Sequence, residues 1–245
     1  MKTFIAVDLE TTGLSADKDC IIEIGALKYK DGECLETFSK LVKPPVPISP
    51  RITEITGIRD AMVADAEPIE VVMKEFIEFV GEEEVLLGHN LSFDYGFLKV
   101  NAAEIGINFQ KKGLDTLKIA RKMLADLPKK DLTTVSTHYG VVNPCAHRAY
   151  EDAMTTAQVY LKMLREFGTD NPELFLPKPL QHKRKKTEPM TIKQKKYLLD
   201  LLKCHRIQGE TFFGQQGKDI DDLTKSEASK LIDKIIATYG RISRY

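Results

Sequence analysis

The sequence predicts an α/β protein built on a mixed sheet flanked by helices, with a small helical module toward its C-terminus. Two β-type runs, residues 21–30 and 33–42, are joined by Asp31-Gly32, a pair typical of a two-residue hairpin turn. Strand-like runs and amphipathic helix patterns then alternate up to about residue 167. An early hairpin followed by alternating strands and helices indicates a mixed sheet with helices packed against it.

The individual elements follow from apolar spacing and from helix signals. Residues 3–9 form a mostly apolar run typical of a strand, and residues 85–87 form a shorter apolar run that leads into a polar loop. Pro68 suits the first turn of a helix that runs through Val80, because apolar residues recur there on one face. We expect four later helices, at about Phe93–Ala103, Thr116–Ala125, Leu132–Tyr139 and Ala149–Phe167.

The composition is that of an ordinary globular protein. The chain has 245 residues and a mass of 27.7 kDa, with 42% hydrophobic and 29% charged residues, which argues against disorder. No uninterrupted apolar run approaches the roughly 20 residues of a membrane-spanning helix, and the first residues lack a signal-segment pattern. We therefore expect a soluble, cytoplasmic protein with no membrane partner. Its four cysteines are far apart and lack a C-x-x-C pair, so we expect reduced thiols rather than a zinc site or a disulfide framework.

Residues 168–190 are the expected boundary between two domains. Several prolines and the run Lys183-Arg184-Lys185-Lys186 disfavour packed structure there. Beyond it, Thr191-x-x-Gln194 and Thr224-x-x-Glu227 match capping boxes, each of which opens an amphipathic helix. We therefore predict a domain over residues 1–167, a linker over 168–190 and a helical module over 191–245, whose role the sequence does not indicate.

A net charge of zero hides an uneven distribution of charge. Residues 177–245 hold 16 Lys and Arg against 8 Asp and Glu, whereas residues 1–176 hold 20 against 28. The C-terminal part therefore has eight excess positive charges, and the remainder has eight excess negative charges. This asymmetry suggests a polyanionic partner for the C-terminal part and a carboxylate-rich site in the remainder. Solvated helix faces often produce similar sums, which is the simpler interpretation.

Two carboxylates end the first predicted strand. Asp8 and Glu10 point to the same side because side chains alternate along a strand, whereas Leu9 points the other way, into the core. Two adjacent carboxylates repel each other and destabilise the fold unless a cation lies between them. The alternative is a hydrated strand end on which both residues are solubilising charges.

Three further residues complete a set that could bind metal ions. Asp94 opens one predicted helix, Asp152 lies in the first turn of another, and His147 precedes that second helix on a loop. Each has a simpler interpretation, since an Asp near a helix N-terminus favours the helix dipole and a loop His can simply be solvated. Together, four carboxylates without cysteine suit two Mg²⁺ or Mn²⁺ ions, and a His can act as general base near neutral pH. This set predicts phosphodiester hydrolysis.

Three segments carry a resemblance to a known family: VDLETTGL (7–14), HNLSFDYGFL (89–98) and HRAYEDA (147–153). In order and separation they resemble the DEDDh 3′–5′ exonucleases, which include the proofreading epsilon subunit of bacterial replicative polymerases. The resemblance implies a ribonuclease H-like fold with a five-stranded mixed sheet. It also implies that His147 is the general base and that the metal-binding carboxylates are Asp8, Glu10, Asp94 and Asp152.

The resemblance also implies a substrate and its contacts. The expected substrate is a single-stranded or frayed 3′ end of DNA, from which nucleoside 5′-monophosphates are released during proofreading or repair. A polymerase or another replication or repair protein is the implied partner. The implied substrate-binding residues are Thr11, Thr12, Gly13, Leu14, Thr56 and Asn90.

Two alternatives to a DNA exonuclease stay open. An RNA-trimming exonuclease has the same architecture, and no residue in the sequence decides between the two sugars. A binding or adaptor protein with a catalytically silent site is the alternative from another class. The presence of all five expected site residues argues against it, because a degenerate site usually lacks at least one.

Overall fold

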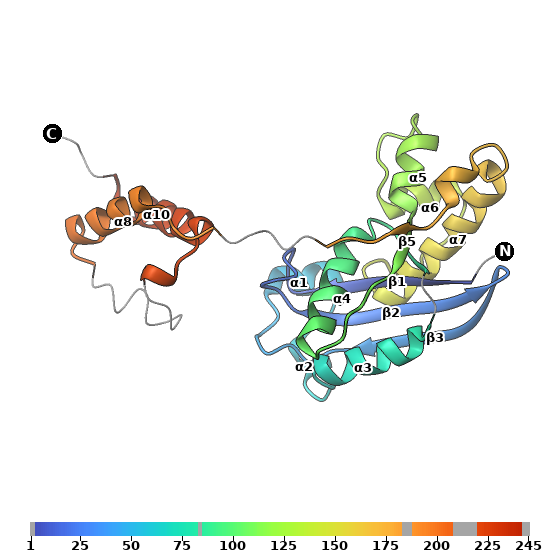
Figure 1. The fold of residues 1–245 in the computed structure, drawn as a ribbon, viewed down its shortest axis with the longest axis horizontal. Helices are drawn as coiled ribbons and strands as arrows, with labels where there is room; N and C mark the ends of the chain where they lie inside the picture. The colour runs from blue at the N-terminus through green and yellow to red at the C-terminus, as the bar shows by residue number, and fades with distance from the viewer. Residues whose placement is uncertain (1–2, 83–84, 183–187, 208–219, 242–245) are drawn as a thin grey trace. The chain divides into compact units, whose positions relative to one another are not determined.

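A computed structural model describes residues 3–82, 85–182, 188–207 and 220–241. These residues belong to two compact units, Met1–His182 and Lys183–Tyr245, and each unit is described by itself (Figure 1). The sheet and the carboxylates of the three motif segments noted above are all in the first unit.

The first unit is built on a mixed sheet with strand order β3-β2-β1-β4-β5-β6. Its strands are β1 (Phe4–Thr11), β2 (Ile21–Lys30), β3 (Glu33–Leu41), β4 (Val85–Gly88), β5 (Lys112–Asp115) and β6 (Lys178–Pro179). The central strand β1 is antiparallel to β2 and parallel to β4. The predicted α/β class with a mixed sheet is therefore confirmed. The described sheet has six strands where the resemblance implied five, because a two-residue strand, β6, pairs with the edge strand β5.

Helices cover both faces of this sheet (Figure 1). They are α1 (Pro50–Thr56), α2 (Asp60–Val63), α3 (Ile69–Val80), α4 (Ser92–Glu104), α5 (Thr116–Met123), α6 (Leu132–His138), α7 (Ala149–Phe167) and the 3₁₀ helix η1 (Pro172–Phe175). Helices α3 and α4 share one core cluster with Ile5, Val7 and Leu9 of β1. Helices α5, α6 and α7 share the other with Phe4 and Ala6. The alternation along β1 thus directs its even-numbered residues, including Asp8 and Glu10, toward the α7 face.

Several elements of this unit were not predicted, α1, α2 and β5 among them, for different reasons. Helix α1 begins at Pro50 after a Ser49 cap whose side chain accepts from Ile52 N, and it ends at Gly57 in the left-handed conformation. These start and stop signals stand in the sequence, but α1 and α2 are only seven and four residues long, too short for a clear apolar period. Strand β5 has four residues and depends on its parallel pairing with β4, a long-range contact that no local pattern indicates.

The second unit is a pair of helices with a small core of its own. Its described elements are α8 (Ile192–Cys204), the 3₁₀ helix η3 (Ile220–Asp222) and α10 (Lys225–Tyr239). Both predicted capping boxes are confirmed, at Thr191 and Thr224. Gln194 bonds the backbone at the start of α10, and His205 bonds Gly240 at its end, so the two helices run in the same direction. Their shared core consists of Leu198, Leu201, Leu202, Leu223, Ile232 and Ile235.

Parts of the sequence-based account fall outside the described residues. The basic run Lys183–Lys186 lies there, as do residues 208–219 of the predicted module. Among the helices that the structure does describe, none is long and apolar enough to cross a membrane. All four cysteines are free thiols; Cys20 is half-buried, and the other three are exposed.

Candidate active site

The site is centred on the end of β1, where the central strand separates from its parallel neighbour. The β1–β4 ladder pairs Ile5 with Leu86 and Ala6 with Leu87, and its register goes no further. Asp8 and Glu10 follow this point on the α7 face, with Asp8 half-buried and Glu10 only 9% exposed. The two carboxylates therefore lie beside an open end of the sheet.

Asp94 joins these two carboxylates from the opposite helix layer. It lies in the first turn of α4 and is 4% exposed. Its Oδ1 accepts a hydrogen bond from the backbone N–H of Leu9 at 3.2 Å, and Leu9 is the residue between Asp8 and Glu10. A side chain 85 residues away in sequence is thereby fixed against the strand that carries the first two acids.

The start of α7 supplies the remaining two residues. Asp152 lies in its first turn, where Oδ2 accepts from the backbone N–H of His147 at 3.0 Å and Oδ1 accepts from Asn143 Nδ2 at 2.5 Å. His147 is exposed and has a left-handed backbone, with φ of 63°. One ligand atom from each of Glu10, His147 and Asp152 lies within 4.8 Å of the other two. The structure thus brings the end of β1 and the start of α7 together.

Burial, together with crowding of negative charge, raises the pKa values of all four carboxylates. Burial raises the pKa of Asp94 to about 8, although hydrogen bonds from backbone N–H groups oppose the rise. Burial likewise raises the pKa of Glu10 to about 8, with a further rise from the negative charge of Asp152. Burial, followed by repulsion from Asp94 and Asp152, raises the pKa of Asp8 well above its ordinary value. Burial also raises the pKa of Asp152, although the hydrogen bond from Asn143 lowers it in part. Such a cluster resists ionisation unless a cation offsets its charge.

Four of the predicted substrate-binding residues lie at the end of β1 and in the closed loop that follows it. The Thr11 hydroxyl donates to Gly13 O at 2.7 Å, and Thr12 exchanges hydrogen bonds with the Cys20 backbone through its N–H and its hydroxyl, each at 2.8 Å. A Cβ atom at Gly13 would overlap the Asp19 carboxylate, so a side chain there would have to displace Asp19. The loop leaves Leu14 88% exposed, an unusual position for a large apolar side chain.

The other two predicted contact residues lie on separate segments. Thr56 is buried at the end of α1, and its hydroxyl bonds Ile52 O and Ile58 N within its own turn. Asn90 follows β4 with φ of 71° and is exposed, and its backbone N–H donates to Asp115 Oδ1 at 3.1 Å. Asn90 therefore lies on the same open end of the sheet as the carboxylates, because it follows the carboxyl end of β4.

Sequence reasoning missed three residues that support the site. Glu23 on β2 is 1% exposed and forms an ion pair with Arg148, the residue that caps α7. Asn143 holds the Asp152 carboxylate. The sequence did contain a signal for Glu23, since it is an acid within the otherwise apolar run Ile21-Ile22-Glu23-Ile24.

Comparisons with known proteins identify the family of the chain. The sequence profile of the family described as "Exonuclease" (RNase T) matches residues 5–160. The DNA polymerase III PolC-type protein of Caldanaerobacter subterraneus subsp. tengcongensis is 43% identical over 163 residues, which cover 66% of this chain and 12% of that protein. The DNA polymerase III subunit epsilon of Aquifex aeolicus is 38% identical over 165 residues, which cover 67% of this chain and 81% of that subunit. The chain thus spans about a tenth of the PolC-type relatives and most of the epsilon subunit.

Solved structures of exonucleases have a similar fold. Exonuclease X in complex with 5′ overhanging duplex DNA has a TM-score of 0.55 at 29% identity, covering 69% of this chain and 93% of that one. Exonuclease I has a TM-score of 0.63 at 22% identity, covering 71% and 42%, which supports the fold alone.

Fold and site together define a ribonuclease H-like nuclease domain with a cluster of acidic residues at the end of its central strand. The chain belongs to the exonuclease family, and the membership that its three motifs implied is confirmed.

Proposed function

We propose that this protein is a metal-dependent 3′–5′ exonuclease that hydrolyses the terminal phosphodiester bond of DNA and releases nucleoside 5′-monophosphates. The observation that carries the proposal is the convergence of five residues from three separate segments. Glu10, His147 and Asp152 offer ligand atoms within 4.8 Å of one another, and Asp94 is fixed to β1 beside Asp8. The donor set consists of carboxylates and one imidazole and includes no thiolate, which suits a hard divalent cation.

The proposed metal-binding residues are the four carboxylates, Asp8, Glu10, Asp94 and Asp152. Their raised pKa values fit this role, because a divalent cation would offset the repulsion that now disfavours their ionised forms. We propose Mg²⁺ or Mn²⁺ as the cofactor, with two ions per site, which is the number that four carboxylates can hold. Two such ions would polarise the scissile phosphate and stabilise the charges that develop on the attacking and leaving oxygens.

The proposed general base is His147. It is exposed and has a left-handed backbone, and its own N–H donates to Asp152. A ring nitrogen lies within 4.8 Å of ligand atoms of Glu10 and Asp152, where the imidazole could take a proton from water. Asn143 and the His147 N–H together occupy both oxygens of Asp152, so this carboxylate has a defined orientation relative to Glu10.

The proposed substrate is a single-stranded or frayed 3′ end. A closed loop at residues 12–20 presents the exposed Leu14 beside β1, where it can pack against the terminal base. Thr11, Thr12, Gly13, Thr56 and Asn90 are the other proposed contacts. DNA is favoured over RNA because the similar PolC-type and epsilon proteins are parts of a DNA polymerase, and because exonuclease X was solved with DNA.

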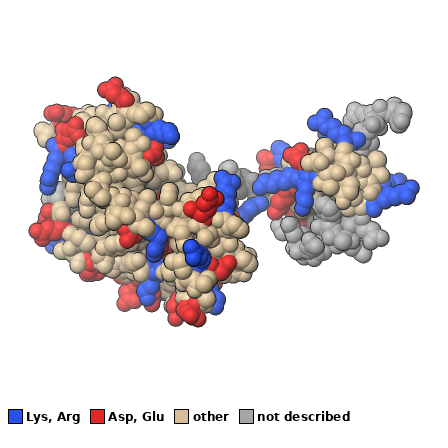
Figure 2. Space-filling view, turned by 180° about the vertical axis from the view of Figure 1, so that it is seen from behind, with Lys and Arg blue, Asp and Glu red and all other residues tan. Residues whose placement is uncertain are grey.

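These relatives also favour a role in DNA replication or repair. We propose a polymerase, or another replication or repair protein, as partner and the cytoplasm as location. The catalytic domain is proposed for residues 1–167, with a linker at 168–190. The helical module at 191–245, together with the basic end of the linker, is proposed as an additional contact for nucleic acid, since residues 177–245 carry eight excess positive charges. Figure 2 shows Lys and Arg side chains around the described surface of this module.

The proposal is tested by the identity and order of the products. A DNA strand labelled at its 3′-terminal nucleotide should release the label first, as a nucleoside 5′-monophosphate, and only with a divalent metal present. A primer with a mispaired 3′ end should be shortened faster than a fully paired one. Release of the label within a longer oligonucleotide, or as a nucleoside without a phosphate, would contradict the proposal. Equal or faster trimming of RNA would favour the RNA enzyme instead.

A further inference from the structure

The strand next to β1 has two residues that contact the start of α7. In the antiparallel register, Glu23 of β2 is opposite Glu10, and Gly25 is opposite Asp8. Residues two apart in a strand face the same side, so Glu23 and Gly25 share the face on which α7 packs. This pair, called the β2 seat below, therefore lies directly beside the two acids of β1.

Gly25 brings the helix backbone into contact with the strand. A Cβ atom built on Gly25 would overlap the backbone carbonyl of Ala149 and the backbone nitrogen of Tyr150. Since the overlap is with main-chain atoms, a side chain at Gly25 cannot be relieved by rotating a neighbour and would have to displace the helix. The close approach therefore fixes the first turn of α7 at a set distance from β2.

Glu23 fixes the orientation of the same turn. Its carboxylate accepts from Arg148 Nε at 3.1–3.2 Å, from Arg148 Nη2 at 2.6 Å and from the backbone N–H of Ala149 at 3.0 Å. A bidentate pair of this kind is strong and directional, and the N–H bond also satisfies one of the free donors at the helix N-terminus. Arg148 and Ala149 lie between His147 and Asp152, so their bonds to Glu23 hold the segment that contains both site residues.

We infer that the β2 seat and Arg148 are positioning residues that set His147 and Asp152 against Glu10. The inference rests on the proposed function of those three residues. Asp8 and Glu10 are on β1, whereas His147 and Asp152 are on a different segment more than 130 residues away, so the separation of the two halves depends on what holds the segments together. Helix α7 also packs on β1 itself, but the ion pair, the N–H bond and the glycine contact are made by the residues opposite the β1 acids.

A merely structural clamp would also stabilise the fold, so the test needs a measurement that separates the two roles. The measurement is Mn²⁺ binding to the full-length protein, followed by the paramagnetic signal of free Mn²⁺, alongside kcat and KM on a short DNA strand. Three variants are compared. Glu23→Gln removes the charge, Arg148→Lys keeps the charge but loses the bidentate geometry, and Gly25→Ala moves the helix while leaving every charge in place.

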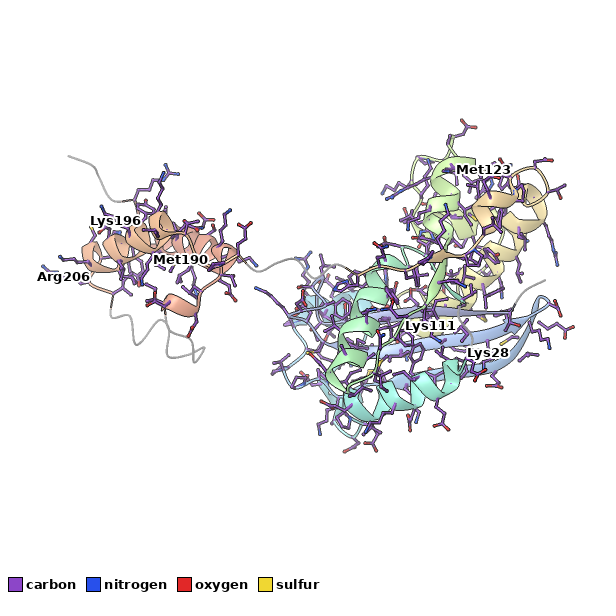
Figure 3. The ribbon with its side chains drawn as sticks, viewed as in Figure 1. Lys28, Lys111, Met123, Met190, Lys196 and Arg206 are labelled. Atoms are coloured by element: carbon purple, nitrogen blue, oxygen red, sulfur yellow. The ribbon has the colours of Figure 1, made fainter. Side chains whose placement is uncertain are left out.

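The matched control is Glu36→Gln. Glu36 on β3 pairs with Lys28 of β2 at 3.4 Å, so this variant also removes an ion pair from the sheet, but an exposed one. Figure 3 shows Lys28 near the end of the sheet that carries the β2–β3 turn. We expect the control to bind Mn²⁺ and turn over DNA like the unchanged protein.

Removing a residue that orients metal ligands typically weakens metal binding or activity 10- to 100-fold. We expect such a loss of Mn²⁺ affinity and of kcat in Glu23→Gln and Gly25→Ala, with KM changed less than twofold, and a smaller loss in Arg148→Lys. Wild-type Mn²⁺ affinity and kcat in folded Glu23→Gln and Arg148→Lys would overturn the inference, as would a fall in melting temperature alone. Because Mn²⁺ binding needs no DNA, the inference stays testable even if the protein cleaves no nucleic acid.

Discussion

The crowded carboxylates make the metal-free protein sensitive to alkaline pH. Glu10 is 9% exposed, and its pKa is raised from 4.5 to about 8, mainly by burial and then by the charge of Asp152. Between pH 4.5 and about pH 8, Glu10 keeps its proton in the folded protein but has already lost it in the unfolded chain. Stability therefore falls as pH rises through the interval, and the loss is complete above the folded-state pKa. With a chelator present, we expect the melting temperature to decrease from pH 5.5 to pH 8.5.

The size of the effect follows from the same two pKa values. Each pH unit between them costs about 1.4 kcal/mol of unfolding free energy, so Glu10 accounts for about 3 kcal/mol between pH 5.5 and its folded-state pKa of about 8. For a domain of this size, 1 kcal/mol changes the melting temperature by about 2–4 °C, which predicts a decrease of about 10 °C. Asp94, whose pKa is also raised to about 8, acts in the same direction.

The assay is thermal unfolding followed by circular dichroism, at several pH values, with a chelator or with Mg²⁺. The transition that Mg²⁺ raises is assigned to the unit that contains the site. We expect Mg²⁺ to stabilise more at pH 8.5 than at pH 5.5, because it binds the ionised acids. Glu10→Gln should flatten the metal-free pH dependence, whereas Glu36→Gln on the exposed face should not. A melting temperature that is constant or rises with pH in chelator, or an unchanged slope in Glu10→Gln, would refute the reasoning.

Three further predictions concern the base, the substrate loop and the module. His147→Ala should lower kcat by about 10²–10⁴-fold without unfolding the protein, as expected for loss of a general base; a change below threefold would count against that role. Leu14→Ala should raise KM several-fold at constant kcat, since this 88% exposed side chain can bury its surface only against a bound strand; an unchanged KM would exclude the contact. In the module, Lys196 and Lys203 are both exposed on α8, and Figure 3 shows Lys196 there. Both are replaced by Glu in an Asp8→Ala background, and the binding constant for DNA is measured at several salt concentrations. The slope of its logarithm against log salt should become shallower by about one for each lost phosphate contact. An unchanged slope would instead indicate a role for the module that does not involve nucleic acid.

Local patterns predicted the parts of this fold that depend on local physics. The alternation along β1 correctly placed Asp8 and Glu10 on one face and Leu9 on the other, because side-chain direction in a strand is fixed by its pleat. Capping boxes correctly located the starts of α8 and α10, because the bonds involved span only three residues. The roles of the five site residues stay predictions until they are measured.

The rest of the site depends on contacts between distant segments. The Glu23–Arg148 pair spans 125 residues, and the Leu9–Asp94 bond spans 85, so neither leaves a periodic signal in the sequence. Glu23 was detectable only as an acid in an apolar run, without an indication of its partner. Strand β6 could not be found either, since it has only two residues, one of them a proline, and becomes a strand only by pairing with β5.

The central claim is that the acids at the end of β1 hydrolyse a nucleic-acid 3′ end with the help of a divalent metal. The most direct measurement uses matched 5′-labelled single strands of DNA and RNA, incubated with Mg²⁺, with Mn²⁺ or with a chelator, beside the Asp8→Ala variant. We predict a ladder of products shortened from the 3′ end, faster on DNA, absent with the chelator and absent with folded Asp8→Ala. Cleavage of neither strand, or equal cleavage by Asp8→Ala, would contradict the claim.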